Sequence, residues 1–119
     1  MKSLEDVKKV KYIHFTTRGR RTGKPHMVEL WFALGGGKVF LSHEGKQTDW
    51  IKNLEKDASI SAEIGGFNFK GKAKVAVEGS SSRELGKKAL YEKYYSKASQ
   101  DVIDDWFSLS TVVEVTPST

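Results

Sequence analysis

The stretch that decides the fold is Thr16-Thr17-Arg18-Gly19-Arg20-Arg21-Thr22-Gly23-Lys24-Pro25-His26-Met27-Val28-Glu29-Leu30-Trp31-Phe32. It is a basic turn between two segments in which apolar and polar residues alternate. The turn holds Arg18, Arg20, Arg21 and Lys24 beside two glycines. Cationic side chains next to free backbone N–H groups are what a bound phosphate or carboxylate needs. The same composition is typical of an ordinary solvated hairpin, because turns favour polar residues and glycine for backbone reasons. At this level both interpretations stay open.

Six segments have the composition and period of β-strands. They span residues 10–17, 26–34, 38–43, 59–64, 67–78 and 109–115. Gly35-Gly36-Gly37 and Gly65-Gly66 separate two pairs of them, and glycine supplies the positive φ of a tight hairpin at no steric cost. In the fifth segment the apolar residues occupy odd-numbered positions and are expected to face inward. They are Phe67, Phe69, Ala73, Val75 and Val77.

Three other segments have helical spacing. Residues 48–56 place Trp50, Ile51 and Leu54 on one face, with Thr48 or Gln47 as the expected N-cap. Residues 81–97 begin with Ser81 and Glu84 at the spacing of a capping box. Residues 100–107 carry a third apolar face, formed by Val102, Ile103, Trp106 and Phe107.

These elements predict a mainly β fold with helices, a six-stranded β-barrel. A short helix follows the third strand, and a helical excursion precedes the last strand. Closure into a barrel explains how so short a chain avoids exposed sheet edges. The length of 119 residues suits a single domain, 1–119, with its core at about residues 10–116.

Composition excludes several classes of site. The chain has no cysteine, so it has no disulfide, no thiolate metal site and no cysteine nucleophile. Its three histidines lack metal-ligand spacing, so no metal is expected. The net charge of +5 suits an anionic ligand, a nucleic acid or a membrane surface. No apolar run approaches the ~20 residues of a membrane span, and no signal peptide is recognisable. We therefore expect a cytoplasmic protein without stable membrane insertion.

The motif Gly19-Arg20-Arg21-Thr22-Gly23-Lys24-Pro25, the apolar Leu30-Trp31-Phe32 and the later Trp50-Ile51-Lys52-Asn53-Leu54 together resemble a known family. This is the deazaflavin (F420)-dependent nitroreductase and quinone reductase family. It belongs to the FMN-binding split-barrel group, which also contains the pyridoxamine 5′-phosphate oxidase-like proteins. The resemblance covers about residues 10–116 and implies a six-stranded split β-barrel of the FMN-binding type.

The resemblance also implies a set of coenzyme-binding residues. Arg20, Arg21 and Thr22 would lie near the phosphate or acidic tail of the coenzyme. The remaining positions would lie beneath the ring system, at its edge or on the first helix: His26, Met27, Val28, Glu29, Leu30, Trp31, Ser42, His43, Lys46, Thr48, Asp49, Trp50 and Asn53. Two of these depart from the family pattern, since the family usually has Arg at His26 and often has Pro at Glu29. The late-helix tyrosines that help form the family's substrate pocket are also replaced, here by Val102 and Ile103.

The implied activity is transfer of a hydride from reduced coenzyme F420 to a quinone, a nitroaromatic compound or an activated enone. The cofactor carries the redox chemistry, so no catalytic side chain is assigned. The expected partner is a small redox substrate, and a homodimer is expected because split-barrel relatives bind flavin at a dimer interface. One alternative is an FMN-binding split-barrel protein, a flavin reductase, oxidase or carrier. A more remote one is a basic nucleic-acid-binding barrel, since Phe67 and Phe69 adjoin Lys70 and Lys72.

Overall fold

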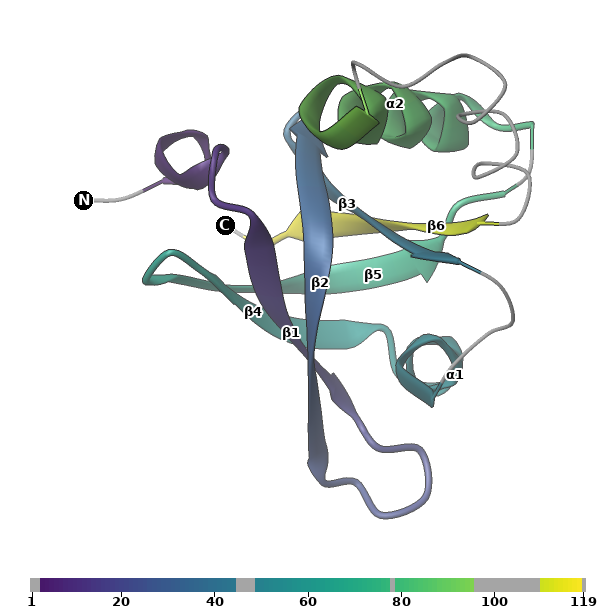
Figure 1. Ribbon diagram of the computed structural model, residues 1–119. Helices are drawn as coiled ribbons and strands as arrows, with labels where there is room; N and C mark the ends of the chain where they lie inside the picture. The colour runs from purple at the N-terminus through teal and green to yellow at the C-terminus, as the bar shows by residue number, and fades with distance from the viewer. Residues whose placement is uncertain (1–2, 45–48, 78, 96–109, 119) are drawn as a thin grey trace.

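A computed structural model describes residues 3–44, 49–77, 79–95 and 110–118 of the chain. In it the strands pair antiparallel in the closed order β1-β2-β3-β6-β5-β4 (Figure 1). Their bounds are β1 Tyr12–Arg18, β2 Pro25–Gly35, β3 Lys38–Glu44, β4 Ser59–Ile64, β5 Phe67–Val75 and β6 Ser110–Pro117. The prediction of a six-stranded β-barrel is therefore confirmed.

Two glycine turns form the hairpins that their sequence predicts. Gly36 and Gly37 have φ values of 56° and 78°, and they join β2 to β3 with Gly35 opposite Lys38. Gly65 and Gly66, at 55° and 90°, join β4 to β5. Positive φ at both central residues matches the right-handed twist of the flanking strands. Each hairpin register therefore follows from its glycine pair.

The barrel interior is filled by alternate strand residues and by α1, Asp49–Lys56. On β1 the buried residues are Ile13, Phe15 and Thr17, while their neighbours face outward. From α1, Trp50 joins the same apolar cluster, with its ring edge-on to Phe15 at a centroid distance of 5.6 Å. The amphipathic face predicted for this helix is thus the face that completes the core.

The second helix, α2 (Ser81–Leu90), lies across the outside of the barrel, and a π-helical turn, η2 (Tyr91–Tyr95), follows it (Figure 1). It approaches the sheet closely, because a Cβ at Gly86 would lie 2.8 Å from Phe40 Cδ1. The Ser82 hydroxyl donates to Oε2 of Glu114 at 2.7 Å, and Lys38 also binds this carboxylate, which is 2% exposed. Burial opposes ionisation, but these hydrogen bonds outweigh it and lower the pKa of Glu114. A buried carboxylate therefore joins α2 to β3 and β6.

Several predicted boundaries need correction. The N-cap of α2 is Ser80 rather than Ser81, because the Ser80 hydroxyl accepts from the Arg83 N–H, so Glu84 is not at the capping-box position. The fifth strand ends at Val75, and Val77 lies beyond it with 72% of its surface exposed. The α-helix predicted over 81–97 ends at Leu90.

A short 3-10 helix, η1 (Glu5–Val7), was not predicted. The expected cap at residues 47–48 and the helix at 100–107 lie outside the described residues. Within the part of the chain that the structure describes, no helix is long and apolar enough to cross a membrane.

Gly71 on β5 provides a test of barrel closure. A Cβ at this position would overlap the carbonyl oxygen of Thr116 on β6, so the two strands would have to separate. We expect Gly71→Ala to lower the free energy of unfolding by about 1–3 kcal/mol, measured by urea denaturation. The exposed Asn68→Ala on the same strand serves as the control and should change stability little. Equal stability of both variants would contradict the close approach.

Candidate functional site

The basic turn closes on itself at the tip of the β1–β2 hairpin. The Gly19 N–H donates to the Lys24 carbonyl, and the Gly23 N–H donates to the Gly19 carbonyl, both at 2.8 Å. Gly23 has a φ of 74°, a conformation that few other residues adopt. The Lys24 N–H donates to Oγ1 of Thr22 at 3.2 Å. These bonds give the turn a defined shape.

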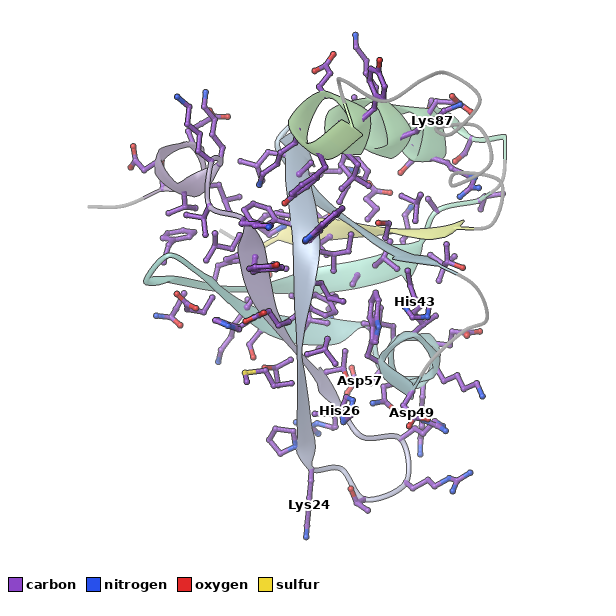
Figure 2. The ribbon with its side chains drawn as sticks, viewed as in Figure 1. Lys24, His26, His43, Asp49, Asp57 and Lys87 are labelled. Atoms are coloured by element: carbon purple, nitrogen blue, oxygen red, sulfur yellow. The ribbon has the colours of Figure 1, made fainter. Side chains whose placement is uncertain are left out.

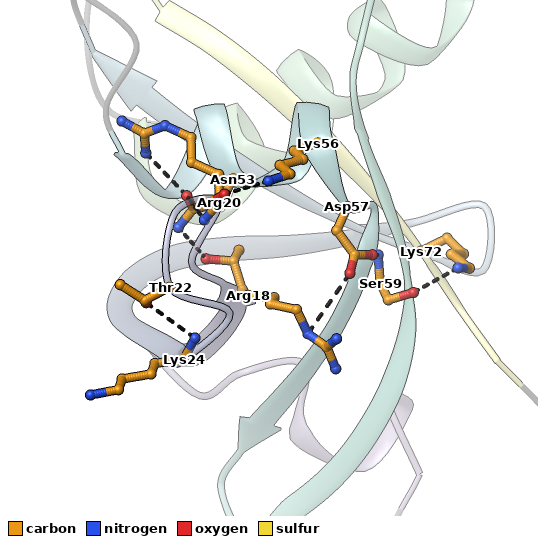
Figure 3. Close-up of polar contacts among 10 residues, drawn as sticks. Arg18, Arg20, Thr22, Lys24, Asn53, Lys56, Asp57, Ser59 and Lys72 are labelled. Atoms are coloured by element: carbon orange, nitrogen blue, oxygen red, sulfur yellow. Dashed lines mark hydrogen bonds and ion pairs between the residues drawn. The ribbon is translucent and has the colours of Figure 1, made fainter.

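Asn53 on α1 joins the turn to the barrel (Figure 3). Its Oδ1 accepts from the backbone N–H and from Nη1 of Arg20, each at 3.1 Å. Its Nδ2 donates to Oγ1 of Thr17 at 3.1 Å. Asn53 and Thr17 are each 2% exposed, so these bonds form away from bulk water. The turn is therefore fixed on α1 by a buried amide whose acceptor atom already has two donors.

Arg20 makes two further contacts with α1. Its Nη2 donates to Oδ1 of Asp49 at 3.1 Å, and the ammonium of Lys56 donates to the carbonyl oxygen of Arg20. The guanidinium thus has partners on α1 before any ligand is considered. This arrangement suits a residue that positions the turn.

A hollow of about 230 Å³ lies between the turn and α1. It brings together six residues predicted from the sequence, namely Arg20, Arg21, Thr22, His26, Asp49 and Asn53. Lys24 also lines it, although the predicted set of coenzyme contacts omitted this residue. Figure 2 shows Lys24 extending from the tip of the hairpin. Neither Arg21 nor Lys24 has a carboxylate partner among the described residues, so the hollow presents uncompensated positive charge that fits an anionic group.

The predicted residues of β2 do not form one surface. Successive strand residues face opposite sides of a sheet. Val28 and Leu30 turn inward and pack against the core, whereas Met27, with 64% of its surface exposed, and Glu29 face outward. A flat ligand on one face of β2 therefore contacts only alternate members of the predicted row.

The predicted residues of β3 and α1 lie at different depths. Trp50 is 3% exposed and belongs to the core, while the ring of His43 stands edge-on to it at a centroid distance of 6.3 Å. Ser42 is half-buried on β3. Lys46 and Thr48 lie outside the described residues. Trp50 therefore carries a packing role whatever else it contacts.

An aromatic pair covers the far part of β2. The rings of Trp31 and Tyr94 are stacked at a centroid distance of 4.5 Å, with an angle of 6° between their planes. The Tyr94 hydroxyl accepts from the Phe32 N–H at 3.2 Å and lies 2.8 Å from the Phe32 carbonyl oxygen. Tyr94 is not among the coenzyme-binding residues predicted from the sequence.

Lys93 is the neighbour of Tyr94 in the chain. Burial lowers the pKa of Lys93 to about 8, and the Lys93 ammonium lies 3.5 Å from the Phe32 ring centroid.

His14 links three strands on the outside of the barrel. Its Nδ1 lies 2.7 Å from Oε1 of Glu63 on β4, and its Nε2 lies 3.1 Å from Oε2 of Glu29 on β2. The hydrogen bonds with Glu63 and then Glu29 raise the pKa of His14. Glu29, predicted to lie under the coenzyme ring, therefore has an imidazole partner. No group of three or more side chains suited to a metal ion occurs in the described ranges.

Removal of the Asn53 amide should loosen the turn. Asn53→Ala leaves the Arg20 N–H and the Thr17 hydroxyl without this buried partner, and we expect a loss of about 2–4 kcal/mol in the free energy of unfolding. Urea denaturation measures it, with the exposed Glu55→Ala on the same helix as the control. A loss no larger than that of Glu55→Ala would argue against the buried network.

The contribution of His14 to stability should depend on pH. Because its folded pKa is raised, the contribution is fully present below the unfolded value of about 6.5 and is lost as pH rises through the folded pKa. The difference in urea midpoint between the wild type and His14→Gln should therefore shrink at alkaline pH. In a Glu63→Gln background most of this pH dependence should disappear. A difference that grows with pH would contradict the contacts described.

Comparisons with known proteins agree with this fold. A family model described as F420H(2)-dependent quinone reductase matches residues 3–104. A conserved hypothetical protein from Mycobacterium tuberculosis is structurally similar with a TM-score of 0.78 and 21% identity, over 100% of this chain and 82% of that one. An F420-H2 dependent reductase gives a TM-score of 0.65 and 22% identity, over 87% and 92% of the two chains.

A Listeria innocua protein assigned as a pyridoxamine 5′-phosphate oxidase gives a TM-score of 0.67 and 12% identity, over 98% and 90%. At these identities the structural neighbours establish a common split-barrel fold. No curated protein matches the sequence.

Proposed function

This chain belongs to the F420H(2)-dependent quinone reductase family, and we propose that it reduces a quinone, a nitroaromatic compound or an activated enone. It is an oxidoreductase whose coenzyme is F420. When bound, the reduced deazaflavin supplies the hydride, and the protein supplies binding, orientation and exclusion of water. A homodimeric state and a cytoplasmic location stay predictions from the sequence.

The observation that supports this proposal best is the hollow beside the basic turn. F420 carries a phosphate and an oligoglutamate tail, and both need cationic partners. Arg21 and Lys24 line the hollow without a carboxylate partner among the described residues. The Thr22 hydroxyl and the exposed His26 lie on the same wall. We assign these four side chains to the anionic part of the coenzyme.

Arg20, Asp49 and Asn53 serve the same site by holding it in place. Their hydrogen bonds fix the turn on α1, so that the backbone carrying Arg21 and Lys24 is in place before the coenzyme arrives. Such preorganisation reduces the entropy lost on binding. We therefore propose Arg20 and Asn53 as positioning residues.

The acceptor is proposed to bind farther along β2, at the stacked pair of Trp31 and Tyr94. A planar quinone or nitroaromatic ring can stack on such a surface. The Tyr94 hydroxyl is hydrogen-bonded to the backbone of Phe32 and of Lys11, which fixes the position of this ring. The proton that completes the reduction is assigned to no side chain and is available from solvent.

FMN is the competing coenzyme, since the fold is shared with a protein assigned as a pyridoxamine 5′-phosphate oxidase. Fluorescence titration of the purified protein with F420 and with FMN separates the two functions. We expect saturable binding of F420 at lower concentration than FMN. Tight FMN binding with no response to F420 would replace the proposed function by that of an FMN protein.

Loss of either free cation should weaken coenzyme binding. We expect Arg21→Gln and Lys24→Gln each to raise the Kd of F420 by about three- to tenfold, because an exposed charge pair contributes roughly 1 kcal/mol. The effect should decrease at high salt, where such pairs are screened. Lys88→Gln removes the same charge from α2, outside the residues that line the hollow, and should leave the Kd unchanged. A Kd that responds equally to all three variants would indicate only a general charge effect.

A further inference from the structure

A hollow of about 520 Å³ lies at the end of β2 that is farther from the basic turn. Its walls come from the N-terminal segment around η1, from the end of β2 and from α2 with η2 (Figure 1). It shares no lining residue with the coenzyme hollow. Its volume is within the range of small-molecule sites, about 300–1,000 Å³. We call it the N-terminal hollow.

Contacts from η2 hold the N-terminal wall of this hollow in place. The Lys93 ammonium donates to the Val10 carbonyl oxygen at 2.7 Å, and the Tyr94 hydroxyl lies 2.7 Å from the Lys11 carbonyl oxygen. Val7 of η1 is 3% exposed and belongs to the barrel core. The segment before β1 is therefore fixed against both η2 and the barrel, so the hollow is a formed part of the fold.

The lining of the N-terminal hollow combines apolar and charged side chains. The apolar part is formed by Ala33, Leu34, Leu85 and Ala89. Leu85 has 39% of its surface exposed, although it is a large apolar residue. The charged part contains four lysines and two glutamates, namely Lys8, Lys9, Lys88, Lys93, Glu5 and Glu92. Excess positive charge beside an apolar surface suits an anion that carries an apolar body.

Three of the four lysines have no carboxylate partner among the described residues. Lys8 forms an ion pair with Glu5 at 3.3 Å, whereas Lys9 and Lys88 are exposed and unpaired in the part of the chain that the structure describes. Lys93 contacts the Val10 carbonyl oxygen and the rings of Phe32 and Tyr94. The hollow therefore offers three ammonium groups to a ligand.

The burial of Lys93 distinguishes this group from an ordinary lysine-rich surface. Its side chain is half-buried, and burial lowers its pKa to about 8. A partly desolvated ammonium without a counter-charge is unfavourable. An anion beside Lys93 supplies that counter-charge and keeps the side chain protonated. A bound anion therefore offsets part of the cost of burying this lysine.

We propose that the N-terminal hollow binds an organic carboxylate with an apolar body, and that Lys93, Lys9 and Lys88 hold the carboxylate. The apolar part of the ligand packs against Leu34 and Leu85. An inorganic anion would leave Leu85 exposed to water, and a neutral apolar compound would leave Lys93 without a counter-charge. Because this hollow is separate from the coenzyme hollow, the inference does not rest on the proposed function.

The test uses 2-naphthoate as the probe, 2-naphthamide as its neutral analogue and inorganic phosphate as an anion without an apolar body. Isothermal titration calorimetry at neutral pH and low salt measures each Kd. We expect saturable binding of 2-naphthoate, with the other two compounds weaker by about threefold or more. Lys9→Gln and Lys93→Gln should each raise the Kd of 2-naphthoate about three- to tenfold. Lys52→Gln, which changes an exposed lysine of α1 outside the hollow, is the matched control and should leave this Kd unchanged.

The titration of Lys93 gives a second readout. Its charged form binds the carboxylate, so affinity for 2-naphthoate should fall as pH rises through about 8. Lys93→Arg should keep its affinity over this range because a guanidinium stays charged, and Lys93→Gln should be weak throughout. The other charged groups of the lining are the same in all three proteins, so the comparison isolates Lys93. They are Glu5, Lys8, Lys9, Lys88 and Glu92.

Several outcomes would overturn the inference. Equal affinity for 2-naphthoate and for either comparison compound would remove the need for charge or for the apolar surface. An unchanged Kd in Lys9→Gln would place the probe elsewhere, and this result holds even if Lys93→Gln weakens the fold. Sedimentation with phosphatidylserine vesicles that 2-naphthoate does not reduce would identify a membrane surface instead. F420 titrated into the same wild-type sample tests the proposed function separately, and its failure to bind would leave this inference standing.

Discussion

Pairing between β1 and β4 closes the barrel, and the position of the basic turn at the end of β1 depends on this closure. Only three residue pairs form it, His14 with Glu63, Phe15 with Ala62 and Thr16 with Ser61. The central pair packs the interior, and the outer pairs place a charged cluster and a hydroxyl pair on the surface. Because β1 also pairs with β2, the same short segment connects the basic turn to β4.

A buried side-chain amide then gives the turn a fixed position on that barrel. Asn53 satisfies the Arg20 backbone and guanidinium with one oxygen and reaches Thr17 with its nitrogen. A buried polar group without partners is costly, so the arrangement forms as a whole or not at all. The cations of the turn therefore differ in their contacts, although their chemistry is similar. Arg20 is bound to α1, whereas Arg21 and Lys24 have no carboxylate partner among the described residues and are the cations that we propose for the coenzyme.

Much of the fold was predictable from local patterns, and the errors have local causes. Period-two alternation identified the strands, and paired glycines located both hairpins because few other residues adopt their φ values. The cap of α2 was misplaced by one residue because Ser80, Ser81 and Ser82 are adjacent, and only backbone geometry selects Ser80. Val77 has the parity of β5, yet the strand ends at Val75. Parity predicts which face a residue takes, whereas the end of a strand depends on where its partners end.

By itself the sequence determined the barrel class, the positions of the tight turns and a basic turn with the motif of an F420-dependent family. These depend on backbone sterics and side-chain period, which act over a few residues. Tertiary structure decided which cations of the turn have partners among the described residues, because Asp49 and Asn53 lie about thirty residues from Arg20 and only folding brings them together. It also divided the β2 row between two faces of the sheet. These features depend on contacts between segments that are distant in the sequence, and a local sequence pattern does not predict such contacts.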